Sequence, residues 1–282
     1  MLAPSRLPNE YSAWNREHKA PFGSPRWVRL VQSRPYGMFA ARVAHGRFVW
    51  QNRMSFPRWL MRRIGAFAFR INSLTRTLEH PWCFHATLLA QDMQAVEIGA
   101  GASGFQFVLA EHDLNVVSVD PLVNPSGTVD WVFSSEEFRR INGAFGGRVR
   151  FIQDHLENAH LESDGYDRVF AISVLEQIPD DNALSIMREI QRILKPDGFF
   201  IATTDLFLDC HPFADRIANQ WWQNVSVRRM VEESDLVLKS GSPCYLHGYP
   251  EFDAKEICRS KRNFLIVNDV MTQCLVLQKF GS

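Results

Sequence analysis

A group of closely spaced glycines constrains what this chain can fold into more than any other feature. Residues 95–107 read AVEIGAGASGFQF, and the apolar segment 105–110 continues without a helix breaker. This pattern predicts a buried strand, a tight turn and the start of a helix. Glycine permits left-handed backbone angles and the close approach of a ligand, and the unpaired N–H groups at a helix start attract ligand oxygens. We therefore expect a ligand-binding loop here.

A second apolar run ends in an acid. Residues 116–120 read VVSVD, which places Asp120 roughly 20 residues after the first glycine, where a carboxylate can accept hydrogen bonds from ribose hydroxyls. The Gly-x-Gly-x-x-Gly spacing also fits a dinucleotide site, so NAD stays open on these two features. Asp120 could also be a simple turn carboxylate before Pro121.

Two later segments help to decide which ligand the glycine loop binds. Residues 167–176 read DRVFAISVLE, and residues 192–204 read RILKPDGFFIATT. With these segments and the glycine loop, the chain resembles the class I S-adenosylmethionine-dependent methyltransferases, in the type 11-like group of small-molecule enzymes. The resemblance extends from Ala95 to about Thr204. Dinucleotide dehydrogenases do not usually carry the Leu-Lys-Pro-Asp-Gly turn, so NAD is the residual alternative.

The resemblance implies an α/β, Rossmann-like, doubly wound seven-stranded sheet with an antiparallel last strand, preceded by a basic N-terminal helical or irregular extension. From the apolar runs we expect strands over residues 95–98, 116–120, 149–153, 168–172, 199–203, 236–239 and 273–279. We expect helices over residues 79–91, 136–142, 179–194, 226–233 and 253–264. The expected domains are a basic, aromatic-rich extension over 1–80 and a methyltransferase domain over 81–282, with an insert at about 243–270.

The resemblance also implies S-adenosyl-L-methionine as the cofactor, with S-adenosyl-L-homocysteine as the product. Asp120 would bind the ribose hydroxyls, Asp154 the exocyclic amine of adenine, and the backbone N–H after Asp154 a ring nitrogen. The alternative for Asp154 is a helix N-cap. The expected cofactor-binding residues are Glu97, Gly99, Ala100, Gly101, Gly104, Asp120, Pro121, Asp154, His155 and Ser173.

Methyl transfer from a sulfonium depends mainly on holding the acceptor in line with the methyl carbon. A general base is needed only when the acceptor must lose a proton early. Family members often read Leu-Glu-His after the fourth strand, but here Gln177 stands in place of the histidine, and an amide takes no proton at neutral pH. His211 and His247 are therefore the candidate bases. The sequence contains no metal-ligand set.

The cysteines and the apolar runs of the sequence indicate the cellular compartment of the protein. The five cysteines are scattered and form no C-x-x-C, which argues against a disulfide framework or zinc site and for a reducing compartment. We find no signal-peptide core at the start and no apolar run of roughly 20 residues. We therefore expect a cytoplasmic protein.

The first 80 residues hold 14 Lys and Arg against 3 Asp and Glu, whereas the rest holds 17 against 28. Apolar residues recur at helical spacing over 57–78, which predicts one amphipathic helix with a basic face. This helix could pack on the domain with its basic face in water, lie on an anionic membrane surface, or contact nucleic acid. We rank the membrane above nucleic acid and do not expect a nucleic-acid partner.

We therefore expect a methyltransferase acting on a small-molecule or a carbohydrate- or lipid-linked acceptor. The alternatives are a non-catalytic S-adenosylmethionine-binding partner protein and an RNA methyltransferase. The acceptor atom and the oligomeric state stay open.

Overall fold

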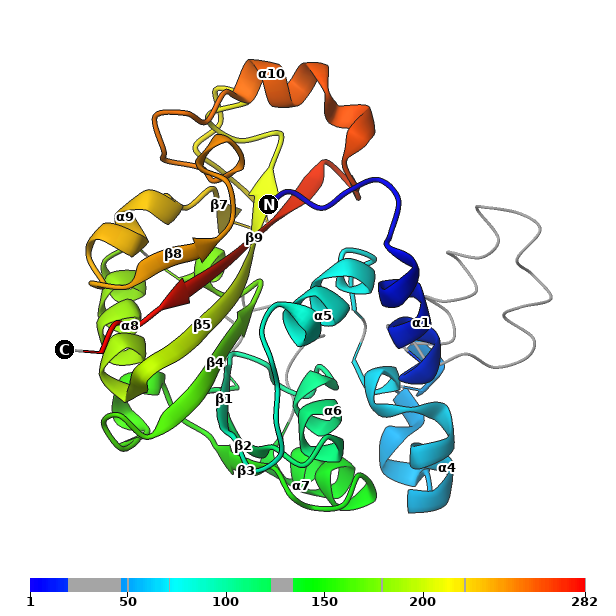
Figure 1. The fold of residues 1–282 in the computed structure, drawn as a ribbon. Coiled ribbons are helices and arrows are strands. Elements are labelled where there is room, and N and C mark those ends of the chain that lie inside the picture. The colour runs from blue at the N-terminus through cyan, green and yellow to red at the C-terminus, as the bar shows by residue number, and fades with distance from the viewer. Residues whose placement is uncertain are drawn as a thin grey trace.

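A computed structural model describes residues 1–19, 47–49, 51–70, 72–122, 134–178, 180–220 and 222–281. One seven-stranded sheet runs through the centre, and helices cover both of its faces (Figure 1). A short two-stranded hairpin lies outside the sheet.

The sheet has the order β3-β2-β1-β4-β5-β9-β8. Its first five strands are parallel, and β9 runs antiparallel to both β5 and β8. The inner strands are near-continuous apolar runs, as expected for a parallel sheet that is buried on both faces. The seven strands are β1 (Gln94–Ile98), β2 (Asn115–Val119), β3 (Arg150–Ile152), β4 (Tyr166–Ile172), β5 (Leu194–Phe207), β8 (Val237–Ser240) and β9 (Val270–Gln278). The predicted fold, including the antiparallel last strand, is confirmed.

Two hydrophobic cores lie on opposite faces of the sheet. One face is covered by α5 (Arg76–His85), α6 (Phe105–Glu111) and α7 (Ser135–Ala144), and the other by α8 (Asp180–Ile193) and α9 (Val227–Glu232) (Figure 1). The predicted helices after strands two, four and five are thereby confirmed within a few residues. The helix expected over 79–91 begins earlier and ends at His85.

The single helix expected over residues 57–78 is wrong. The chain forms α4 (Arg58–Ile64), a 3-10 turn (Ala66–Ala68), and then α5. Gly65 ends α4 with φ of 98°, a left-handed conformation that favours glycine and stops a helix. The turn that follows buries Phe67 completely. Part of the predicted helix, Ile71, lies outside the described residues.

The described part of the N-terminal segment packs on the main domain. In α1 (Asn9–Glu17), the buried ring of Trp14 lies 5.8 Å from that of Phe67 and 6.4 Å from that of Phe105. Leu2 pairs with Gln273 of β9 in an antiparallel bridge. The boundary at residue 80 stays a prediction. Residues 20–46, a large part of the extension described above as basic and aromatic-rich, lie outside the described residues.

The late insert and a hairpin complete the fold. Between β8 and β9 lie two 3-10 turns (Pro243–Tyr245 and Lys261–Asn263) and α10 (Ala254–Arg259), so the helix expected over 253–264 is shorter. The hairpin of β6 (Ala218–Asn219) and β7 (Trp222–Gln223) was not predicted.

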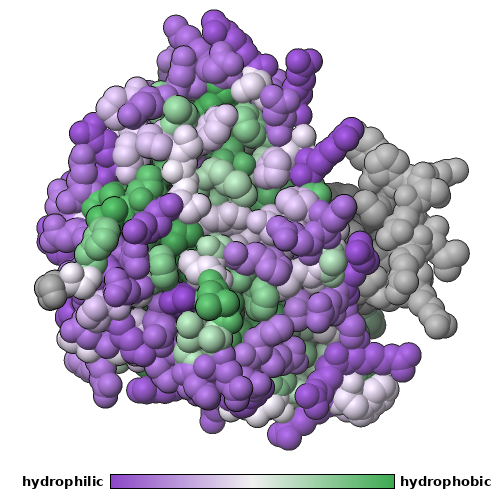
Figure 2. All heavy atoms as spheres, viewed as in Figure 1, coloured by the Kyte–Doolittle hydropathy of each residue, from purple (hydrophilic) through white to green (hydrophobic). Residues whose placement is uncertain are grey.

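The face drawn in Figure 2 is mostly hydrophilic, and hydrophobic residues gather over α9 and β8. In the described part of the chain, no helix has the length and apolar character to cross a membrane. The same residues contain no group of three or more His, Cys, Asp or Glu able to hold a metal ion.

Candidate cofactor site

The glycine loop connects β1 to α6 through left-handed backbone angles. Gly99 has φ of 66° and Gly104 has φ of 106°. A Cβ on Gly99 would lie 2.7 Å from a methyl group of Val174, and one on Gly104 would lie 2.7 Å from the ring of Phe67. Real Cβ atoms do not approach so closely, so both positions require glycine for packing as well as for conformation.

Asp120 closes the loop from the end of β2. Its Oδ2 accepts a hydrogen bond of 2.6 Å from the N–H of Gly101, and its Oδ1 accepts one of 2.6 Å from the N–H of Leu122. A carboxylate has about four acceptor positions, so Asp120 can still accept bonds from ribose hydroxyls. Pro121 follows it directly and is half-buried.

Asp154 lies on the surface just beyond β3, whose last residue accepts a hydrogen bond from the N–H of Asp120 (3.1 Å). Its Oδ1 accepts bonds from Asn158 Nδ2 (3.1 Å) and from the N–H of His155 (2.7 Å). These two bonds lower the pKa of Asp154. The contacts are those of a turn carboxylate. The adenine roles of Asp154 and His155 stay predictions.

Arg70 covers the glycine loop, and sequence reasoning missed it. Its Nη1 donates to the carbonyl of Ala100 (2.9 Å) and would lie 3.1 Å from a Cβ on Gly101. The only sequence signal was the excess of basic residues before residue 80. Arg70 brings a fixed positive charge to the loop, which suits a ligand carboxylate.

Glu97 lies beneath the loop with only 1% of its surface exposed. Its Oε1 accepts a 3.3 Å bond from Ser103, and its Oε2 has no hydrogen-bond partner among the described residues. Burial raises the pKa of Glu97 to about 8. Buried polar atoms are normally paired, so the orphaned oxygen leaves room for a cationic or donor group at the loop.

Together these groups fit S-adenosylmethionine. Asp120 suits its ribose, Arg70 its carboxylate, and the glycines allow its chain to approach the backbone. Glu97 provides negative charge beneath a ligand that carries an ammonium and a sulfonium. The structure thus brings the predicted residues Glu97, Ala100, Gly101 and Asp120 together and adds Arg70 to them.

Comparison with known proteins decides the family. Residues 96–202 match the model of the family described as "Methyltransferase domain". The chain carries a class I S-adenosylmethionine-dependent methyltransferase domain. The cofactor of this domain is S-adenosylmethionine, so the predicted family and cofactor are confirmed.

Individual relatives of the methyltransferase domain are distant. The sterol 4-C-methyltransferase strm-1 of Caenorhabditis elegans is 27% identical over 113 residues, a match that spans 40% of this chain and 31% of that protein. The YcgJ protein of Bacillus subtilis is 15% identical, with a TM-score of 0.50 over 72% of this chain and 99% of that one. The cyclase SpnF is 14% identical, with a TM-score of 0.50 over 72% of this chain and 81% of that one. The two solved structures show the fold alone, and since one is a cyclase, the fold does not fix the reaction.

A second polar cluster of the methyltransferase domain surrounds Ser173, directly after β4. Ser173 has φ of 47° and is buried. Its hydroxyl lies 2.8 Å from Glu79 Oε1, 3.3 Å from Asp205 Oδ1 and 2.6 Å from Arg76 Nη1. Arg76 forms an ion pair with Glu79. The sequence predicted Ser173, but it gave no signal for the three residues around it.

The two candidate bases lie apart from this cluster in the described contacts. His211 is exposed. His247 is half-buried, and its Nδ1 lies 3.0 Å from the carbonyl of Val225. Burial lowers the pKa of His247. The catalytic role of either histidine stays a prediction.

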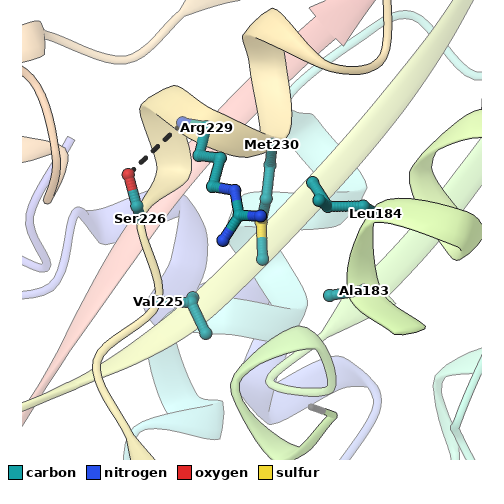
Figure 3. Close-up of a pocket in the computed structure, with 6 residues that line it drawn as sticks. All are labelled: Ala183, Leu184, Val225, Ser226, Arg229 and Met230. Carbon is teal, nitrogen blue, oxygen red and sulfur yellow. Dashed lines mark hydrogen bonds between the residues drawn. The ribbon is translucent and has the colours of Figure 1, made fainter. Parts of the chain in front are cut away.

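A small pocket lies between α8 and α9 (Figure 3). Its volume is about 20 Å³, enough for a single water, so it cannot hold an acceptor. Across its rim the hydroxyl of Ser226 caps α9 by accepting from the N–H of Arg229 (3.3 Å).

Proposed function

We propose that the chain transfers the methyl group of S-adenosylmethionine to a small-molecule acceptor. The observation that carries this proposal is that Asp120 and Arg70 both hydrogen-bond to the backbone of the glycine loop. Asp120 accepts a bond from the N–H of Gly101, and Arg70 donates one to the carbonyl of Ala100. In this proposal Asp120 would hold the ribose, and Arg70 would hold the carboxylate of the cofactor. When bound, the cofactor supplies an activated methyl group, so the chain mainly has to align the acceptor with it.

The acceptor class is the finer part of the proposal. The sterol methyltransferase relative, by its name, acts on a sterol, which agrees with a small or lipid-linked acceptor. The hairpin and the insert between β8 and β9 follow the sheet's last parallel strand in sequence, and loops of this kind often carry specificity.

Calorimetric titration tests the cofactor part. We expect S-adenosylmethionine and S-adenosylhomocysteine to bind the full chain and NAD not to bind. Asp120→Ala should lose this binding, whereas Asp215→Ala, which changes an exposed aspartate, should keep it. Binding of NAD alone, or equal binding by the Asp120 variant, would contradict the proposal. A methyl-release assay then separates an enzyme from a non-catalytic binding protein, and an affinity that falls steeply with salt would favour RNA.

We also propose that the end of the molecule that carries α4 contacts a membrane surface. One surface feature supports this contact. Trp59 is 64% exposed, and the basic side chains of Arg58, Arg62 and Arg63 are exposed around it on α4. An exposed aromatic ring beside several arginines suits an anionic lipid surface.

Vesicle sedimentation tests this contact. We expect the full chain to bind vesicles of phosphatidylcholine with phosphatidylglycerol better than vesicles of phosphatidylcholine alone. Trp59→Ala should weaken this binding, and Leu88→Ala, which removes another exposed apolar side chain, should not. Equal retention of both variants would rule out the contact through α4.

A further inference from the structure

Glu176 carries a buried carboxyl group for which the described fold provides no partner. It lies in the 3-10 turn Leu175–Gln177 just after β4, and only 1% of its surface is exposed. Neither of its side-chain oxygens has a hydrogen-bond partner in the described part of the chain. Such burial is unfavourable unless a proton or a ligand completes the group.

The charged neighbours of Glu176 are mostly of its own sign. Asp205 of β5 and Glu79 of α5 act on it electrostatically, and Arg76 of α5 is the cation among these neighbours. Ser173 links the set, because its hydroxyl contacts Glu79, Asp205 and Arg76. We call Arg76, Glu79, Ser173, Glu176 and Asp205 the acidic cluster. With three carboxyl groups for one guanidinium, it attracts either protons or a further cation.

The environment of the cluster shifts the pKa values of its carboxyl groups in the direction expected from this excess of negative charge. Burial, followed by repulsion from Asp205, raises the pKa of Glu176 well above its ordinary value, and the positive charge of Arg76 opposes this rise. Burial and the charge of Glu79 raise the pKa of Asp205 to about 7, although the charge of Arg76 and the hydrogen bond to Ser173 act to lower it. Groups that hold protons near neutral pH are suited to proton transfer.

The position of the cluster separates it from the ribose end of the cofactor site. Asp120 follows β2, whereas Ser173 follows β4 and Asp205 lies near the end of β5, and β1 stands between these two sides. In open α/β sheets ligands bind beyond the carboxyl ends of the strands. The cluster also reaches solvent, because Asp205 is only partly buried and the Arg76 side chain is 17% exposed.

We propose that the acidic cluster is the acceptor site and that it binds a basic nitrogen, held as an ammonium by Asp205 and deprotonated by Glu176. Binding of the ammonium favours the ionised form of Glu176, which gives its own proton to water. A proton then passes from the nitrogen to a Glu176 oxygen and frees the lone pair. A C–N bond then forms as the C–S bond breaks, and its electron pair stays on the sulfur, which becomes a neutral thioether. The methylated nitrogen keeps one positive charge, and Glu176 returns its proton to water. This inference rests on the proposed methyl transfer.

The test uses the full chain loaded with S-adenosylhomocysteine, titrated with benzylamine and with its neutral counterpart benzyl alcohol at up to millimolar concentrations. We expect benzylamine to bind and benzyl alcohol not to bind. Glu176→Gln and Asp205→Asn should each weaken benzylamine binding roughly 10- to 100-fold, the effect of one lost charged contact. Glu111→Gln, at an exposed position, should change nothing. Absence of amine binding, or equal binding of the alcohol, would overturn the proposal.

The ammonium group of the cofactor itself could occupy the acidic cluster in place of an acceptor amine. The affinity of the variants for S-adenosylhomocysteine distinguishes these two possibilities. If the cluster serves the acceptor, Glu176→Gln and Asp205→Asn keep this affinity within about threefold of the unmodified chain. A loss of tenfold or more in both variants would assign the cluster to the cofactor instead. If the unmodified chain binds no S-adenosylhomocysteine, the proposed function itself fails, which is a separate result. For any amine that is methylated, Glu176→Gln should lower kcat more than it raises KM.

Discussion

Arg70 Nη1 lies 2.9 Å from the carbonyl oxygen of Ala100, although 30 positions separate the two residues in the chain. This contact places a guanidinium from the N-terminal segment directly on the glycine loop. The segment therefore contributes to the cofactor site of the methyltransferase domain as well as covering its core.

Replacing Arg70 should weaken cofactor binding. We expect Arg70→Met to lower the affinity for S-adenosylhomocysteine roughly 10- to 100-fold, because the variant loses a charged contact to the ligand carboxylate. Isothermal titration measures the change. Arg62→Met, which alters an exposed arginine of α4, is the matched control and should leave the affinity unchanged. An Arg70 variant with full affinity would show that the guanidinium only supports the loop.

Gly104 should not tolerate a side chain. Gly104→Ala places a methyl group 2.7 Å from Phe67 and 2.9 Å from the backbone of Ala66, at a φ of 106°. We expect the free energy of unfolding to fall by about 1–3 kcal/mol in urea titrations. Gly143→Ala lies within α7, where the nearest atom is 3.6 Å away, and should be neutral or stabilising by up to about 1 kcal/mol. Similar losses in both variants would argue against the tight contact.

The stability of the cofactor-free chain should depend on pH through Glu97. Its folded pKa of about 8 exceeds the ordinary value of 4.5, so between these values the folded state keeps a proton that the unfolded state releases. The free energy of unfolding therefore falls as pH rises through this window, by at most about 1.4 kcal/mol per pH unit. Glu97→Gln removes this contribution, so its stability relative to the unmodified chain should rise from pH 5 to about 8. A constant difference across that range would show that Glu97 is ionised throughout.

Phe67 should bind the N-terminal segment to the domain. It is fully buried, its ring lies 5.8 Å from that of Trp14 in α1, and it packs so closely on Gly104 of the glycine loop that a Cβ there would lie 2.7 Å from it. We expect Phe67→Ala to destabilise the chain by about 3–5 kcal/mol and to keep a single unfolding transition. Trp59→Ala, at an exposed ring, should change stability by less than about 0.5 kcal/mol. A second transition would instead favour an independent unit over residues 1–80.

The sheet and the glycine loop could be predicted because their signals are local. The inner strands β1 and β2 are short, mostly apolar runs, and Gly99 and Gly104 stand where the backbone must turn under close contacts. The end of α4 could not be predicted, because apolar residues keep helical spacing across Gly65. That break depends on where Phe67 is buried, which is a property of the whole fold.

The polar residues that complete the two sites were missed for a related reason. Arg70 and Arg76 reach their sites from a segment without a recognisable motif, and Glu79 contacts Ser173 across 94 positions of sequence. In the sequence, Gln177 marks a missing histidine, whereas the neighbouring Glu176 is simply the last residue of the segment 167–176. Only its burial without a partner shows that it is unusual.

The pairing of residues 1–3 with β9 affects the order of events during synthesis. The N–H of Ala3 donates to the carbonyl of Thr272, and that of Cys274 donates to the carbonyl of Met1. Residues 1–3 therefore leave the ribosome long before their partners in β9 and stay unpaired until β9 is made. Contacts so distant in sequence slow folding and leave apolar surface exposed meanwhile. The same delay applies to Glu79, since Thr272 supplies one of its hydrogen bonds (3.2 Å), so the acidic cluster is completed only when β9 enters the sheet.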